Sequence, residues 1–101
     1  MIKFAGANGG PQGFGLSGGF LEGLIDVALF AHPDDLSVDK RGNIYVADTN
    51  NARIRMITPA GQVPTIVAAV ESLGIEVDRQ RDILYISDSP RHQIWAVDLP
   101  V

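Results

Sequence analysis

The stretch LSVDKRGNIYVADTNNARIRMI, residues 36–57, decides the fold of this chain. Leu36 and Val38 alternate with polar neighbours, and residues 44–47 (IYVA) form a β-rich run that is too short for a helix. Turn-forming residues follow both runs, first at 39–42 (DKRG) and then at 48–51 (DTNN). Residues 53–57 (RIRMI) then alternate again, so the stretch predicts three short strands joined by two turns.

A shift of 39 to 40 residues places this unit on a second copy further along the chain. Residues 75–78 fall on 36–39, residues 85–88 on 45–48, and residues 93–97 on 53–57, with one extra residue in the turn 79–82. A period of about 40 residues built from strands alone indicates a β-propeller, with one four-stranded blade per repeat.

Residues 33–57 (PDDLSVDKRGNIYVADTNNARIRMI) resemble an NHL repeat. The second copy resembles a degenerate version of it, because it keeps the V-D and Y-I-S-D pairs but has Ser72, Arg81 and Gln93 in place of a proline, a glycine and an arginine. This resemblance implies a propeller, commonly six-bladed, in a family whose members bind proteins, bind RNA or catalyse reactions.

The order of the strands is predicted to be permuted. Residues 2–6 resemble residues 65–69, and both are expected to be the fourth, outermost strand of a blade; Pro64 fits an edge strand because proline cannot donate to a ladder. Residues 1–6 are then an outer strand, 7–32 a glycine-rich loop with a short helix, 33–69 the first blade, and 70–101 a second blade that lacks its outer strand.

We therefore expect an all-β fold, a β-propeller of four-stranded antiparallel blades with two blades per chain, whose ring is completed by oligomerisation. Repeats of this kind generally need three or more stacked units. Ile2, Lys3, Phe4 and Ala5 would be the inter-chain strand that each copy donates to its neighbour, and a homotrimer would give the six blades of the family.

The glycine-rich segment at residues 7–32 carries two further patterns. Residues 13–18 (GFGLSG) spell G-x-G-x-x-G, but the strand and βαβ unit that a dinucleotide site requires are not visible around them. The segment is therefore interpreted as a loop. Leu21, Leu24, Ile25, Ala28 and Leu29 recur at helical spacing, which predicts a short amphipathic helix packed on a blade edge.

Composition narrows the class of protein. The chain has 101 residues, 46% of them hydrophobic, a net charge of −4 and no cysteine, which is typical of a single globular domain. It shows neither a membrane span nor the apolar core of a signal peptide, so a cytoplasmic location is expected. The sequence pI near 4.8 argues against nonspecific nucleic-acid binding by the whole surface.

Polar residues of the propeller's usual ligand face are the candidate site. They are His32, Asp34, Asp35, Asn50, Asn51, Arg91 and His92. Histidines with carboxylates can hold a metal, yet His32 and His92 lack an H-x-x-x-H spacing. Asp34 and Asp35 could serve acid–base chemistry, but closing the turn into the inner strand is the favoured role. No catalytic residue, metal ligand or cofactor is assigned.

Charged residues that recur in both repeats are expected to have structural roles. Asp39 and Asp78 lie at the first turn of each repeat, and Asp48 and Asp88 follow its second strand, where they would cap turn amides or pair with Arg53. On the opposite face, basic residues are nearly balanced by acidic ones. The basic residues are Lys40, Arg41, Arg79 and Arg81, and the acidic ones are Asp39, Asp78 and Asp82.

Two local expectations complete the fold. Gly42 and Asn43 are predicted to form a tight hairpin turn with Gly42 at positive φ. Tyr85 and Trp95 are predicted to be buried between blades, because they stand where the first repeat has Tyr45 and Arg55.

The favoured function is a non-catalytic binding or scaffold module that self-assembles and takes an unidentified protein or small molecule as partner. One alternative is a hydrolase or lyase with a divalent metal over the central channel. Bound metal that depends on His32 or His92 would indicate this enzyme. The other alternative is an RNA-binding propeller. Retention on RNA that weakens steeply with salt would indicate this function.

Overall fold

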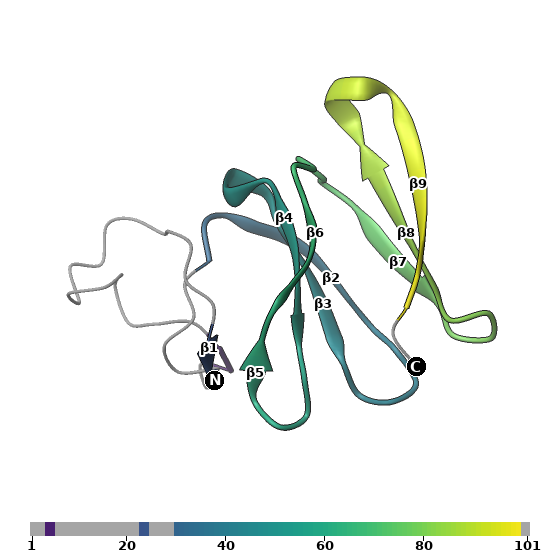
Figure 1. Ribbon diagram of the computed structural model, residues 1–101. Coiled ribbons are helices and arrows are strands. Elements are labelled where there is room, and N and C mark those ends of the chain that lie inside the picture. Colours follow the sequence, from purple (N-terminus) through teal and green to yellow (C-terminus); the bar gives the residue numbers. More distant parts are fainter. Residues whose placement is uncertain (1–3, 6–22, 25–29, 100–101) are drawn as a thin grey trace, which may run out of the picture.

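The protein folds into antiparallel β-sheets, in a computed structural model that describes residues 4–5, 23–24 and 30–99 (Figure 1). The first sheet has the order β2-β3-β4-β6 and the second the order β7-β8-β9. A separate two-stranded pairing joins β1 to β5. The strands are β1 (Gly23–Leu24), β2 (Pro33–Val38), β3 (Ile44–Asp48), β4 (Arg53–Ile57), β5 (Gln62–Val63), β6 (Thr65–Ala68), β7 (Ile75–Asp78), β8 (Ile83–Asp88) and β9 (Gln93–Asp98). The described part of the chain is thus all-β, with two up-and-down sheets that are consistent with a fragment of a β-propeller.

Each sheet places a short 3-10 turn between its second and third strands. These turns are η1 (Thr49–Asn51) and η2 (Ser89–Arg91). Each ends at a residue in the left-handed region, Ala52 with φ of 53° and His92 with φ of 56°. The repeated sequence pattern therefore produces the same corner twice.

Pro64 separates β5 from β6, the fourth strand of the first sheet. β6 pairs with β4 through Ile54 and Val67, and the register shifts between Ile54 and Arg55. Proline has no N–H to donate, so it is tolerated on this outer strand, where β4 is the only described partner of β6. The predicted placement of Pro64 at an edge is confirmed.

The turn from β2 to β3 is built around the carboxylate of Asp39. Its Oδ1 accepts hydrogen bonds from the backbone N–H groups of Arg41 (2.8 Å) and Asn43 (3.0 Å), and its Oδ2 accepts one from the Tyr45 hydroxyl (2.8 Å). Gly42 has φ of +90°, which confirms the predicted positive φ. The connection runs over residues 39–43 and is wider than the predicted two-residue turn, because Asp39 N–H bonds to Asn43 C=O.

The two sheets pack face to face and form the main core between them. We call the face of each sheet that bears Tyr45 or Tyr85 its front face, and the opposite one its back face. Tyr45 and Ile54 on the first front face pack against Leu84 and Ile86 on the second back face, and all four are fully buried. This contact surface is the seam of the molecule.

The back face of the first sheet is covered by segments that precede it in the chain. Val46, Ile57 and Val63 form a second buried cluster, against which Phe30 and Ala5 pack. Each face of the first sheet therefore carries an apolar cluster.

Two predictions about the first third of the chain have different outcomes. The helix over residues 21–29 is wrong at Gly23 and Leu24, which are strand β1, because their backbone pairs with Gln62 and Val63 instead of bonding along a helix. The donated strand lies mostly outside the described residues, since only Phe4 and Ala5 belong to them. The G-x-G-x-x-G segment lies wholly outside them.

Within the described residues, no helix is long and apolar enough to cross a membrane.

The predicted burial of Tyr85 and Trp95 is wrong for the chain as it stands. Tyr85 is 38% exposed and Trp95 46% exposed. Tyr45, the equivalent of Tyr85, is buried because the second sheet covers its face, whereas none of the described sheets covers the face that bears Tyr85.

Replacing Gly42 with alanine should lower the free energy of unfolding by about 1 kcal/mol or more, because an L side chain disfavours the positive φ at this position. The added Cβ would lie 3.6 Å from Pro59 Cγ, so backbone strain and not a clash causes the loss. Urea denaturation followed by circular dichroism measures it. Gly74→Ala is the matched control, since Gly74 has no positive φ and its Cβ would meet only ordinary contacts. Equal losses in both variants would contradict the prediction.

Candidate functional site

The centre of the first repeat is the buried carboxylate of Asp48 at the end of β3. Its Oδ2 accepts hydrogen bonds from Arg55 Nη1 (2.9 Å) and Asn51 Nδ2 (2.8 Å). Its Oδ1 accepts one from the Ala31 N–H (2.7 Å). Asp48 and Arg55 have no exposed side-chain surface, and Arg55 Cζ lies 4.9 Å from the centre of the Phe30 ring. The predicted partner Arg53 is thus wrong, because Arg55 holds the ion pair.

The second repeat builds the same arrangement around Asp88 with different donors. Asp88 Oδ2 accepts hydrogen bonds from Trp95 Nε1 (2.8 Å) and Arg91 Nη1 (3.1 Å). Trp95 follows Asp88 by the same interval as Arg55 follows Asp48, so an indole N–H replaces a guanidinium N–H at one position of the repeat. The recurrence of these aspartates therefore reflects a structural role.

Pro90 changes the link between Asp88 and the segment before β7. In the first repeat, the Asn50 N–H donates to the Ala31 C=O (3.0 Å), which holds the Ala31 N–H beside Asp48. Pro90 stands at the position of Asn50 and has no N–H to donate. Asp88 Oδ1 is buried and has no hydrogen-bond partner among the described residues.

Hydrogen bonds to the carboxylates shift their titration. The Trp95 N–H, followed by Arg91, holds the pKa of Asp88 below its ordinary value. Burial acts to raise the pKa of Asp39, but the hydrogen bonds from Asn43, Tyr45 and the backbone together lower it. Burial and the bond to Asp39 in turn raise the pKa of Tyr45. Both aspartates are therefore ionised in the folded protein at neutral pH.

Side chains of β2 hold the backbone of β7 across the seam. Asp35 Oδ2 accepts a hydrogen bond from the Ile75 N–H (2.9 Å), and Ser37 Oγ accepts one from the Val77 N–H (3.0 Å). These bonds satisfy amides of β7 that face the first sheet, and so they fix the register of one sheet on the other.

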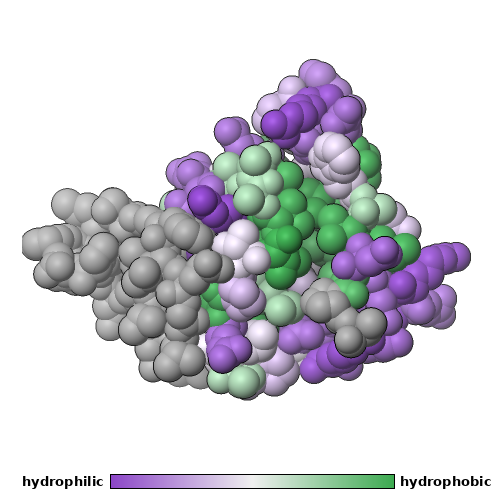
Figure 2. Space-filling view, viewed as in Figure 1, coloured by the Kyte–Doolittle hydropathy of each residue, from purple (hydrophilic) through white to green (hydrophobic). Residues whose placement is uncertain are grey.

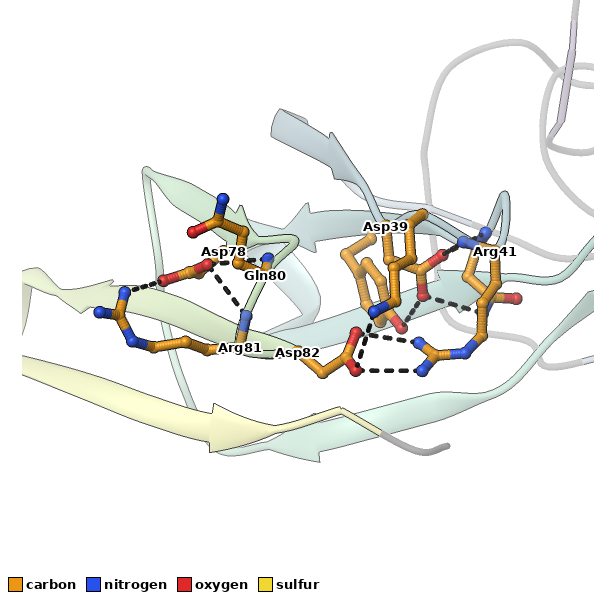
Figure 3. Close-up of polar contacts among 9 residues, drawn as sticks. Asp39, Arg41, Asp78, Gln80, Arg81 and Asp82 are labelled. Atoms are coloured by element: carbon orange, nitrogen blue, oxygen red, sulfur yellow. Dashed lines mark hydrogen bonds and ion pairs between the residues drawn. The ribbon is translucent and has the colours of Figure 1, made fainter.

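Ion pairs join the turns at one end of the sheets (Figure 3). Arg41 from the β2–β3 turn makes two hydrogen bonds of 3.1 Å to the carboxylate of Asp82 in the β7–β8 turn. Arg81 pairs with Asp78 within its own turn at 2.8 Å. Direct pairs thus account for part of the predicted balance on this face, because Asp82 and Asp78 are paired with basic side chains. Asp39 instead holds its own turn, and Arg79 donates to the Val38 C=O.

The predicted ligand-face residues are distributed over several local contacts. His32 Nδ1 lies 2.9 Å from Asp34 Oδ1, and Thr49 and His32 lower the pKa of Asp34. Asn51 bonds to Asp48, Arg91 to Asp88, and Asp35 to the seam. Asn50 and His92 are exposed. The part of the chain that the structure describes contains no cluster of three side chains able to hold a metal ion.

Sequence reasoning missed Arg55 and Trp95 as partners of the buried carboxylates. Both follow their aspartate at the same spacing, with a turn in between. That shared interval was the available signal.

Replacing Trp95 with phenylalanine should lower the melting temperature by a few degrees at pH 7, because Asp88 loses the donor that most lowers its pKa. Because the pKa of Asp88 is lower in the folded protein, its carboxylate stabilises the fold at pH values above the unfolded pKa of about 4. This stabilisation is lost as the pH falls through the folded pKa. The difference from the unmodified chain should therefore shrink below about pH 4.

Thermal melts followed by circular dichroism at pH 7 and pH 3 measure this difference. Tyr85→Phe is the control, since Tyr85 is 38% exposed on the opposite face of the same sheet and does not bond to Asp88. A Trp95→Phe deficit that is the same at both pH values would contradict the assignment.

Comparison with known proteins agrees with this repeat geometry. Residues 30–56 match the NHL repeat family, and they run from Phe30 through nearly all of β4. The chain is also similar to human NHL repeat-containing protein 2, with 27% identity over a 99-residue alignment. The match covers 80% of this chain and 14% of that protein. This chain therefore spans only a small part of the length of that relative. The chain thus contains an NHL repeat at residues 30–56, and the similarity to an NHL repeat-containing protein supports this.

Proposed function

We propose that this chain is a non-catalytic binding or scaffold module that assembles with copies of itself into a closed NHL-type β-propeller. As a homotrimer, it would form a ring of six blades, to which each copy contributes its two sheets. The NHL repeat supports the assignment of a propeller-type binding or scaffold module.

Unequal exposure of equivalent residues carries this proposal. Leu36 on the first back face is 61% exposed, whereas its equivalent Ile75 is 6% exposed within the seam. Ile94 on the second front face is 71% exposed, whereas its equivalent Ile54 is fully buried. The second front face thus lies open around Ile94, and the first back face is open at Leu36, beside the cluster that Phe30 and Ala5 cover. The seam supplies a built example of how such faces pack. A front face of one copy against a back face of the next gives a head-to-tail contact, which closes into a ring only if the rotation between copies fits.

The edges of the sheets support strand exchange between copies. β9 pairs with β8 alone among the described strands, whereas β4, its equivalent, also pairs with β6. Unpaired strand edges favour pairing with another chain. Residues 2–5 of a neighbouring copy would supply the missing strand, and Phe4, which is 59% exposed, would then lie beside Ile94 as Val67 lies beside Ile54. Ala5 already packs against the back face, as the outer strand of a preceding blade would.

Structural contacts of the candidate polar residues favour the non-catalytic function. Asp35, Asn51 and Arg91 each bond to the seam or to a buried aspartate. Asp35 thus holds the second sheet, and Asn51 and Arg91 hold the buried carboxylates.

Light scattering of the purified chain should give a mass of about 32 kDa, three times the chain mass of 10.8 kDa. Ile94→Asp should reduce this mass to that of one chain, because it places a charge on a face that only the assembly buries. Ala60→Asp, in an exposed turn, is the control that should keep the trimer. Deletion of residues 1–6 should also dissolve the ring. A folded 10.8 kDa monomer, or a trimer that survives Ile94→Asp, would overturn the proposal.

A further inference from the structure

A cavity of about 270 Å³ lies at the outer part of the seam, between β6 with the segment that follows it and β9. One wall is formed by Val67, Ala69 and Val70, and the other by Trp95 and Val97. Figure 2 shows apolar surface where β6 faces the second sheet. Both walls belong to one chain.

The first repeat shows what this space accommodates. There Phe30 covers Arg55, with 4.9 Å from the guanidinium carbon to the ring centre. Ala69 stands at the sequence position of Phe30, and it lines the cavity beside Trp95, the equivalent of Arg55. The second repeat thus leaves open a place that an aromatic ring fills in the first. An apolar cavity of about 150 Å³ is already large enough for benzene, so the volume is sufficient for one ring.

The polar groups at the cavity have fixed positions. The Trp95 indole is 46% exposed, yet its N–H is bonded to the buried carboxylate of Asp88. Arg91 also lines the cavity, and its Nη1 bonds to Asp88 and to the Ala69 C=O (3.3 Å). Its side chain is 56% exposed, so its charge is accessible to a ligand. An anchored indole face beside a guanidinium suits an aromatic ring with an acidic group next to it.

We propose that this cavity, which we call the seam pocket, binds a segment of a partner protein that inserts one aromatic side chain next to an acidic residue. The ring stacks on Trp95 between the apolar walls, in the place that Phe30 takes in the first repeat. The carboxylate of the neighbouring residue pairs with Arg91. The seam pocket is thus a recognition site for a short acidic–aromatic peptide.

The probe for this site is acetyl-glutamyl-phenylalanine amide, titrated into the full chain. Trp95 is the only tryptophan, so the NMR signal of its indole N–H reports on the seam pocket alone. A saturable shift is expected, with half-saturation on the order of 1 mM for so small a ligand. Acetyl-glutamyl-alanine amide should bind roughly tenfold more weakly because it lacks the ring. Acetyl-lysyl-phenylalanine amide should bind about threefold more weakly because its charge repels Arg91.

Two variants separate the seam pocket from other surfaces. Ala68→Phe adds a ring at an exposed strand residue that lines the cavity, and it should abolish the shift. Ala60→Phe adds the same ring in an exposed turn away from it and should leave the affinity unchanged. Circular dichroism verifies that both variants fold. Equal binding of the phenylalanine and alanine peptides, no saturable shift, or retained affinity in folded Ala68→Phe would overturn the proposal; the peptide comparison holds even if that variant does not fold.

Discussion

A buried carboxylate requires hydrogen-bond donors, and this requirement at Asp48 organises the first sheet. Arg55 from β4 and Ala31 from the preceding segment both donate to it, so that a side chain and a linker are fixed at once. Removing one partner of a buried ion pair typically costs about 3–5 kcal/mol, whereas an exposed pair such as Arg41 with Asp82 contributes about 1 kcal/mol or less. Breaking the buried pair would therefore cost more stability than breaking the exposed one.

Packing of the two sheets follows from how each strand alternates. Tyr45 and Ile54 must point to the same side for the first front face to be apolar, and the pairing of β3 with β4 satisfies this. Asp35 and Ser37 then accept backbone N–H groups of β7, which prevents the second sheet from sliding along the first. Apolar burial brings the sheets together, and these directional bonds set their register.

Local patterns explain which parts of this structure could be predicted from sequence. Strand alternation, the 40-residue period, Pro64 and the positive φ of Gly42 all depend on neighbours in the chain. Contacts set by distant partners could not be predicted in this way. The apolar spacing around Gly23 and Leu24 is helical, yet the edge of β5 provides a strand partner for these residues. Burial of Tyr85 likewise depends on whether another sheet covers its face.

Differences between the two repeats are coupled. Trp95 donates one hydrogen bond to a carboxylate where Arg55 forms an ion pair, and a small Ala69 lies beside the larger indole where Phe30 lies over the guanidinium. Pro90 removes the N–H that would hold the segment before β7 against its aspartate. Because these changes meet at one corner of the second sheet, they keep the carboxylate hydrogen-bonded while opening the outer seam. The degenerate repeat thus retains the structural role of the motif and gains a surface that the regular repeat has filled.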